Sequence, residues 1–305
     1  MGNKPKIVVI AGPTGVGKSS LGIELANAFN GEIISADSMQ IYRGLDIGTG
    51  KVSKEEQKQA VHHLIDILSP DYNDYSVNNF VEDARKKIYD IISRGKLPII
   101  VGGTGLYIKA LLNGYTFANS KRSEELTEKY EKIALEKGNE YVHDMLKKID
   151  KISADRIEPN KLRAVIRAIT VYEETGKKFS EQNDKNNEFD YLLIGLNLDR
   201  DELYKRIDYR MGQMFNEGLV EEFEKLYNSG LTRDNKSMQS ICYKELFDYK
   251  EGKTTLSETI KLVQQHSRNY AKRQITWLKK MDNINWYSPN DKVLIIEKVK
   301  KFIER

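Results

Sequence analysis

The sequence predicts an α/β fold, in which a parallel sheet core flanked by helices carries an inserted small all-helical subdomain. Short apolar runs alternate with helix-like stretches over the first hundred residues. A charged stretch without strand-like runs follows, and a further strand-like run comes after it. Continuous apolar runs of this kind are typical of strands that are buried on both faces of a parallel sheet.

Five apolar segments predict the strands: Lys6–Ala11, Glu32–Ala36, Leu97–Val101, Tyr191–Leu198 and Ile284–Tyr287. Helical spacing predicts helices over Leu21–Phe29 and Asn78–Ser93 between the first of these strands. We therefore expect residues 1–117 to form the first part of the core and residues 118–189 the helical insertion. We expect residues 190–305 to form the second part of the core, including a basic C-terminal helix.

Length and composition limit the class of protein. A chain of 305 residues fits two domains or one large domain with an insertion. The net charge is 49 − 45 = +4, which by itself says little about nucleic acid. The single cysteine, Cys242, excludes an internal disulfide and a cysteine zinc site, and no apolar run reaches the roughly 18 residues of a membrane span. The sequence thus predicts a cytoplasmic protein without a membrane segment or an obligate protein partner, and a monomer.

A phosphate-binding loop follows the first strand. The segment Gly12-Pro13-Thr14-Gly15-Val16-Gly17-Lys18-Ser19 matches G-x₄-G-K-[ST] and leads into a helix that we expect to begin at Ser20. In such a loop, backbone N–H groups and the helix N-terminus bind an anion. Lys18 would reach the terminal phosphate oxygens, and the Ser19 hydroxyl would ligate Mg²⁺. The core is therefore predicted to be P-loop NTPase-like.

The motif does not specify the polyphosphate. No segment fits the Asn-Lys-x-Asp pattern of a GTPase, because Asn235-Lys236-Ser237 is followed by Met238. The strand Leu97–Val101 ends in Gly102-Gly103-Thr104-Gly105, without the carboxylate that a motor or switch ATPase usually has there. Both classes are disfavoured.

Asp37 follows the second predicted strand, and is therefore expected at the sheet edge that faces the ligand crevice. An aspartate there can act as a general base or hold a metal ion, and from spacing alone it could equally cap the next turn.

The residues after Asp37 carry a resemblance to a known family. The motif Asp37-Ser38-Met39-Gln40-Ile41-Tyr42-Arg43 resembles the second signature of the bacterial tRNA dimethylallyltransferases, also called tRNA isopentenyltransferases. Further motifs follow in the order of that family: Asp46–Thr49, His62–Asp66, Gly102–Tyr107, Arg163–Ala168, Thr175–Lys177, Gly218–Glu222, Tyr243–Glu245 and Lys272–Trp277. Two residues depart from its pattern. Cys242 stands where the family usually has glycine, and Val52 where it tends to have proline.

The resemblance implies an activity. Members transfer the dimethylallyl group of dimethylallyl diphosphate to the exocyclic N6 of the adenosine on the 3′ side of the anticodon, in tRNAs that read codons beginning with U. The P-loop would then bind the diphosphate leaving group in place of ATP phosphates. By position, Lys18, Mg²⁺, Thr104 and Arg210 would stabilise that diphosphate, and Asp37 would accept the N6 proton. Ser38 and Gln40 would hydrogen-bond the adenine edge.

Positive charge is concentrated near the C-terminus. The segment His266–Lys280 holds five Lys or Arg residues and no acidic residue. If Glu258–Met281 is one helix, one side carries Lys261, Arg268, Lys272 and Lys279, and the opposite side carries Ile260, Val263, Ser267, Tyr270, Gln274, Trp277 and Met281. A helix packed by one face and basic on the other is expected to contact phosphates, although a solvated surface helix is the alternative.

A second basic segment, Pro159–Tyr172, lies in the predicted insertion. Leu162, Val165, Ile166 and Ile169 form its apolar stripe, whereas Arg163 and Arg167 share another face. The polar stretch Glu173–Asp190 is interpreted as a connector, and Phe179–Asp190 within it is expected to let the insertion close over an anticodon loop. The residues predicted to contact tRNA are Asp37, Ser38, Met39, Gln40, Arg163, Arg167, Tyr243, Lys244, Lys272, Arg273 and Lys279.

Three alternative functions stay open at this point. A kinase of a small metabolite would explain Lys18, Ser19 and Asp37 but not the basic helix. A prenyltransferase that acts on free adenine nucleotides would need neither that helix nor Arg163 and Arg167. In a non-catalytic RNA-binding protein, Asp37 would be dispensable.

Overall fold

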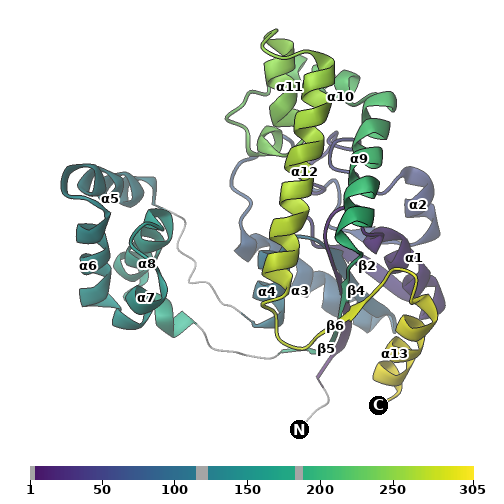
Figure 1. Ribbon diagram of the computed structural model, residues 1–305. Coiled ribbons are helices and arrows are strands. Elements are labelled where there is room, and N and C mark those ends of the chain that lie inside the picture. The colour runs from purple at the N-terminus through teal and green to yellow at the C-terminus, as the bar shows by residue number, and fades with distance from the viewer. Residues whose placement is uncertain (1–3, 115–122, 183–187) are drawn as a thin grey trace. The chain divides into compact units, whose positions relative to one another are not determined.

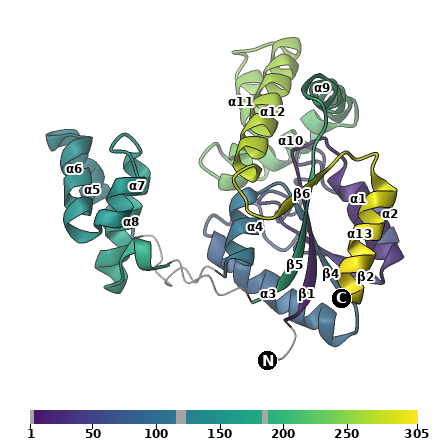
Figure 2. The same cartoon turned by 60° about the horizontal axis from the view of Figure 1, so that its bottom comes forward.

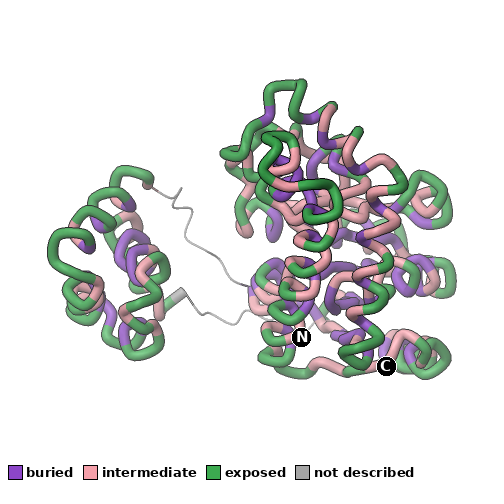
Figure 3. Tube along the Cα trace, turned by 45° about the horizontal axis from the view of Figure 1, so that its top comes forward, coloured by how far each residue is buried: buried purple, intermediate pink, exposed green. Residues whose placement is uncertain are grey.

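The computed structural model of the chain describes residues 4–114, 123–182 and 188–305. The chain divides into two compact units, of which the larger comprises residues 1–112 and 188–305 and the smaller residues 113–187. Figure 3 shows that each unit has a buried interior of its own.

The larger unit contains a six-stranded, all-parallel sheet (Figure 1). The strand order is β3-β2-β4-β1-β5-β6. The strands are β1 (Lys6–Ala11), β2 (Gly31–Ser35), β3 (His62–His63), β4 (Leu97–Gly102), β5 (Asp190–Leu196) and β6 (Ile284–Tyr287). The five predicted strands are confirmed to within two residues at each end.

Helices cover both faces of the sheet. The chain steps from β1 to β2 in one direction and from β3 to β4 in the other. Right-handed crossovers therefore put α1 (Lys18–Ala28) and α3 (Val77–Ser93) on opposite faces. In Figure 2, α13 (Lys292–Glu304) lies on the side of α1, and α4 (Gly105–Leu112) on the side of α3. With both faces covered, residues Ile7 to Ala11 of β1 are completely buried, which explains their continuous apolar sequence.

The remaining helices of the larger unit follow β2 and β5. They are α2 (Lys54–Gln59), α9 (Arg200–Asn216), α10 (Leu219–Asn228), α11 (Tyr243–Lys250) and α12 (Leu256–Leu278), with a short 3₁₀ turn at Lys236–Gln239. The long helix α12 packs against α9, α11 and α4.

The predicted packing face of α12 is only partly right. Its buried residues are Thr259, Val263, Ser267, Ala271, Gln274 and Leu278. Tyr270 and Trp277, predicted on the packed side, are only half-buried. Because α12 contacts α9, α11 and α4, its buried face is rotated towards Ala271 and Leu278. On the predicted basic side, Lys261, Lys272 and Lys279 are exposed, but Arg268 forms an ion pair of 2.5 Å with Asp208.

The smaller unit is helical over the residues that the structure describes. Its elements are α5 (Glu124–Lys137), α6 (Asn139–Ile149), α7 (Lys151–Arg156), α8 (Leu162–Thr175) and a 3₁₀ turn at Phe179–Gln182. They enclose a small core that includes Tyr130, Leu146 and Val165.

The ends of the insertion differ in part from the prediction. Glu173–Thr175, predicted as connector, still belongs to α8. Glu188 pairs with Arg85 at 2.7 Å and Phe189 is buried, so both belong to the larger unit. The predicted boundary at 117/118 and connector residues 183–187 lie outside the described residues. No described helix combines the length and the apolar composition that a bilayer crossing needs.

Candidate active site

The phosphate loop forms the sharp turn that its glycines predict. Gly15 and Gly17 have φ angles of +77° and +100°, a region that residues with a side chain rarely adopt. Gly17 precedes α1, so the helix begins at Lys18, two residues before the predicted start. Backbone N–H groups at this helix start are available to an anion.

Lys18 lies beside two other charged groups of the site. Its ammonium donates to the Pro13 carbonyl oxygen at 2.7 Å. The pKa of Lys18 is lowered from 10.5 to about 8, chiefly because burial disfavours the charged form; the charge of Asp37 opposes this shift and that of Arg210 adds to it. An anion bound in the loop would favour the charged ammonium.

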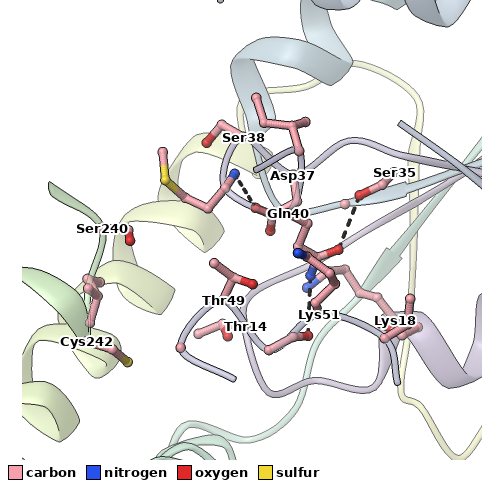
Figure 4. Close-up of a pocket in the computed structure, with 18 of the residues that line it drawn as sticks. Thr14, Lys18, Ser35, Asp37, Ser38, Gln40, Thr49, Lys51, Ser240 and Cys242 are labelled. Atoms are coloured by element: carbon pink, nitrogen blue, oxygen red, sulfur yellow. Dashed lines mark hydrogen bonds between the residues drawn. The ribbon is translucent and has the colours of Figure 1, made fainter. Parts of the chain in front are cut away.

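The turn after β2 holds Asp37 and the adenine-binding candidates (Figure 4). Asp37 Oδ1 accepts the N–H of Met39 at 2.9 Å, so the carboxylate shapes its own turn. The Gln40 side chain is held at both ends: its Oε1 accepts the Ser35 hydroxyl at 3.3 Å, and its Nε2 donates to the Gly50 carbonyl at 3.3 Å. This geometry fixes the turn without using the second carboxylate oxygen of Asp37.

Thr104 supports that turn from the neighbouring strand. Its Oγ1 accepts the N–H of Ser38 at 3.2 Å, while its own N–H donates to the Ala36 carbonyl. Ser38 lines the cavity, whereas Thr104 does not line it and contacts Ser38 instead. The structure thus gives Thr104 a positioning contact, and its predicted contact with the diphosphate stays a prediction.

A cavity of about 820 Å³ brings these elements together. Its lining includes residues of the phosphate loop, of the turn after β2, of α9 and of α12: Thr14, Gly15, Gly17, Lys18, Ser19, Asp37, Ser38, Met39, Gln40, Arg210, Tyr270, Arg273 and Gln274. Cys242 and Lys244 line it as well. An anion-binding loop, an ammonium, a guanidinium and a carboxylate therefore face one space, which suits the displacement of an anionic leaving group.

Arg210 comes from α9 and is fixed by the backbone. Its Nη2 donates to the Gly50 carbonyl at 3.0 Å, the same oxygen that Gln40 binds. Arg206, one turn earlier, pairs with Glu202 at 2.8 Å on the exposed surface and does not line the cavity. The helical spacing could not distinguish the two arginines, but the structure does.

Gln274 is a site residue that sequence reasoning did not identify. This side chain of α12 accepts the N–H of Thr14 at 2.9 Å and donates to the Gly103 carbonyl at 3.0 Å. Two sequence signals pointed to it: Gln274 lies within the motif Lys272–Trp277, and it is a glutamine on the predicted packed face, where an apolar residue is usual.

The structure corrects one predicted RNA contact. Tyr243 is fully buried, and its hydroxyl donates to Glu222, so it is not available to RNA. Lys244, Lys272, Arg273 and Lys279 are exposed. Arg273 also lies over the Tyr270 ring, 5.6 Å from its centroid.

The two arginines of α8 differ in their surroundings. Arg163 is exposed and lines a groove on the helical unit with Leu135, Asn139 and Lys161. Arg167 is half-buried and lies 3.8 Å from Glu174. Arg163 is therefore the more accessible of the two.

The oxygen ligands present fit a magnesium ion. Ser19 and Asp37 line the same cavity, and both carry the hard oxygen donors that Mg²⁺ prefers. No cluster of three or more His, Cys, Asp or Glu side chains suited to a metal occurs among the described residues. Mg²⁺ commonly binds one or two protein ligands together with substrate phosphates and water, so a sparse donor set suits it.

Comparison with known proteins gives a consistent result. The family model described as IPP transferase matches residues 40–281, and the model described as isopentenyl transferase matches residues 5–67. A tRNA dimethylallyltransferase of Bacillus cereus (strain AH187) is 49% identical over 291 residues, which cover 94% of this chain and 91% of the relative. A tRNA dimethylallyltransferase of Bacillus anthracis is also 49% identical, with 94% and 92% covered.

Solved structures agree in fold. The tRNA isopentenylpyrophosphate transferase of Bacillus halodurans is 40% identical with a TM-score of 0.75, over 99% of this chain and 97% of that one. A eukaryotic dimethylallyltransferase acting on tRNA is 32% identical with a TM-score of 0.85, over 98% of this chain and 80% of that one. The fold is thus the P-loop NTPase-like one that the sequence predicted.

Proposed function

Because this chain belongs to the IPP transferase family, that of the tRNA dimethylallyltransferases, we propose that the cavity around Lys18 and Asp37 is its catalytic centre. The chain is a transferase that moves a dimethylallyl group onto tRNA. The roles given below to single residues, to the metal ion and to the RNA-binding surfaces are part of the proposal.

The reaction joins two substrates in one displacement. The donor is dimethylallyl diphosphate, and the acceptor is the exocyclic N6 of the adenosine on the 3′ side of the anticodon, in tRNAs that read codons beginning with U. A bond forms between N6 and C1 of the allyl group while the C1–O bond breaks. The diphosphate leaves with the electron pair, and N6 loses one proton.

The charges around the cavity match these steps. The phosphate loop, Lys18 and Arg210 bind the diphosphate and stabilise the charge that develops on it. Asp37 accepts the N6 proton through the carboxylate oxygen that its turn does not use. Ser38 and Gln40 hydrogen-bond the edge of the adenine, which has to be extruded from the anticodon stack. Thr104 fixes the turn that carries them.

Mg²⁺ completes the diphosphate site in this proposal. The Ser19 hydroxyl would hold the ion together with diphosphate oxygens. Bound there, it supplies positive charge to the leaving group.

Each unit offers a surface for the anticodon stem-loop. In the larger unit, Lys272 and Lys279 are exposed on α12, and Lys244 and Arg273 line the cavity. In the helical unit, Arg163 lies on an exposed groove. Exposed basic side chains of this kind bind RNA phosphates or stack on splayed bases. A monomeric state and a cytoplasmic location remain predictions from the sequence.

The observation that carries the proposal is the convergence of Lys18, Asp37, Gln40 and Arg210 on one cavity. The test is incubation with labelled dimethylallyl diphosphate and Mg²⁺, with unmodified tRNA in one series and AMP or ATP in another. Label on N6 of tRNA alone supports the proposal. Label on free nucleotides would favour a nucleotide prenyltransferase. Phosphate transfer from ATP to a small metabolite would favour a kinase.

A further inference from the structure

Glu222 binds the backbone of a loop next to the site. This residue of α10 belongs to the motif Gly218–Glu222, to which the activity described above gives no role. Its Oε2 accepts the N–H groups of Asp46 at 2.9 Å and Ile47 at 2.8 Å, and its Oε1 accepts the N–H of Gly48 at 3.0 Å. Three consecutive backbone donors thus converge on one carboxylate.

The hydroxyl of Tyr243 is the fourth donor to this carboxylate. It reaches Glu222 Oε1 at 2.5 Å. Burial, followed by the charge of Glu222, raises the pKa of Tyr243 well above its ordinary value, so the hydroxyl keeps its proton and donates. Four donors and no acceptor surround the carboxylate, and only a carboxylate can accept from all of them.

The loop itself, Asp46–Gly50, is compact enough to move as one body. The N–H of Gly50 donates to the Ile47 carbonyl at 2.9 Å, and the Thr49 hydroxyl donates to the Leu45 carbonyl at 2.6 Å. We call this segment the 46–50 loop. A displacement at its Glu222 end is therefore carried to Gly50.

The other end of the loop touches the reaction centre. The Gly50 carbonyl accepts both Arg210 Nη2 at 3.0 Å and Gln40 Nε2 at 3.3 Å. Arg210 is the proposed partner of the diphosphate, and Gln40 the proposed partner of the adenine. One carbonyl oxygen thus fixes groups that act on the two different substrates.

We propose that Glu222 is a positioning residue for prenyl transfer: by binding the 46–50 loop it fixes the Gly50 carbonyl, and through it Arg210 and Gln40. The distance between the bound diphosphate and the bound adenine is thereby fixed. Displacements of about 1 Å in reacting groups can reduce a rate roughly 100-fold, so the loop can influence the rate without touching a substrate. This inference rests on the function proposed above.

The first test replaces Glu222 by glutamine, with its exposed neighbour Glu221 as the matched control. In Glu222→Gln an NH₂ group has to face at least one of the donors, so part of the loop loses its acceptor. We expect the single-turnover rate at saturating substrates to fall to about one tenth of that of the unsubstituted protein, or lower. The affinity for tRNA should stay within about threefold of its original value. Glu221→Gln removes the same charge and should match the unsubstituted protein.

A double-mutant cycle separates positioning from a general loss of structure. If Glu222 acts through Arg210 and Gln40, the substitution Glu222→Gln should change the rate less than about twofold in an Arg210→Ala/Gln40→Ala background. A merely structural role predicts that the full effect is retained in that background. Additive effects, or an unchanged rate in Glu222→Gln itself, would overturn the proposal.

Gly48→Ala tests the same loop without changing a charge. A Cβ atom at Gly48 would lie 2.6 Å from the Tyr243 ring, so the loop has to shift. We expect Gly48→Ala to lower the single-turnover rate as Glu222→Gln does. In the Arg210→Ala/Gln40→Ala background, Gly48→Ala should likewise have little further effect on the rate. Thermal melts of every variant establish that the protein compared is folded. Absence of tRNA labelling by the unsubstituted protein would reject the proposed function itself, which is a distinct outcome.

Discussion

Gln274 binds Thr14, a residue 260 positions earlier in the sequence. Its Oε1 accepts the Thr14 N–H at 2.9 Å, and its Nε2 donates to the Gly103 carbonyl at 3.0 Å. The phosphate loop, the turn after β4 and helix α12 are therefore joined by one buried side chain.

Replacing Gln274 by alanine should destabilise the protein. The change leaves the Thr14 N–H and the Gly103 carbonyl without this partner, which costs about 1–3 kcal/mol for each buried group that stays unsatisfied. We expect a clearly lower free energy of unfolding in urea, together with weaker binding of inorganic diphosphate. Gln265→Ala, at an exposed position of the same helix, is the control. Equal stability of the two variants would contradict this role.

Diphosphate binding should weaken above a pH of about 8. Burial lowers the pKa of Lys18 to about 8, and only the protonated side chain attracts the anion. The value of kcat/KM for dimethylallyl diphosphate should therefore fall as pH rises through that pKa, because this ratio reports ionisations of the free enzyme. In Lys18→Arg the guanidinium stays charged, so the alkaline decline should disappear even if the maximal rate is lower. A decline that persists in Lys18→Arg would assign it to another group.

Asp37 should affect chemistry more than RNA binding. A general base contributes roughly 10²–10⁴-fold in rate, so Asp37→Ala should lower the single-turnover rate by that order. Asp37→Asn keeps the acceptor for the Met39 N–H and thus the turn, so its loss of rate isolates the proton transfer. Both variants should keep their tRNA affinity, measured by filter binding. Rescue of the rate by raised Mg²⁺ would instead identify Asp37 as a metal ligand.

Lys272 and Lys279 should contribute to tRNA binding through phosphates. Replacing both by alanine should weaken the binding of all tRNAs similarly. It should also reduce the slope of log K for tRNA association against log salt, by up to about 0.9 for each lost phosphate contact. The exposed Lys298 of α13 serves as the control for loss of positive charge. An unchanged slope would exclude this part of α12 from the RNA interface.

Cys242→Gly should stabilise the protein. Cys242 has a φ angle of +85°, which costs a residue with a side chain about 1–3 kcal/mol and a glycine very little. Cys242→Ala keeps the Cβ atom and loses the buried sulfur, so we expect the order of stability Gly > Cys > Ala in chemical denaturation. A glycine variant less stable than the cysteine protein would show that packing of the thiol outweighs the backbone strain.

Most of the fold could be predicted from the sequence because the strands are buried on both faces. Continuous apolar runs identified five of the six strands, and fixed spacing identified the phosphate loop. The face of α12 was harder to predict, since helical periodicity does not say how many neighbours a helix has. Tyr270 and Trp277 were therefore placed too deep, and Ala271 and Leu278 were missed.

The contacts that position the site could not be predicted from local patterns. Gln274 reaches a loop 260 positions earlier in the chain, and Glu222 binds a loop more than 170 positions earlier. Tyr243 was predicted to contact RNA as part of the family-like motif Tyr243–Glu245, yet its ring is buried and its hydroxyl donates to Glu222. Pairings of this kind depend on how α10, α11 and α12 pack, which no single helix pattern specifies.

The place of β5 in the sheet has a consequence for biosynthesis. This strand pairs with β1 from Lys6–Asp190 to Ala11–Gly195, although the helical unit lies between them in the chain. A ribosome therefore completes the helical unit before it releases the strand that closes the centre of the sheet. Helical units with local contacts fold quickly, whereas an edge of β1 stays open in the growing chain and can pair with another molecule. We expect the nascent protein to be most prone to aggregation just before β5 emerges.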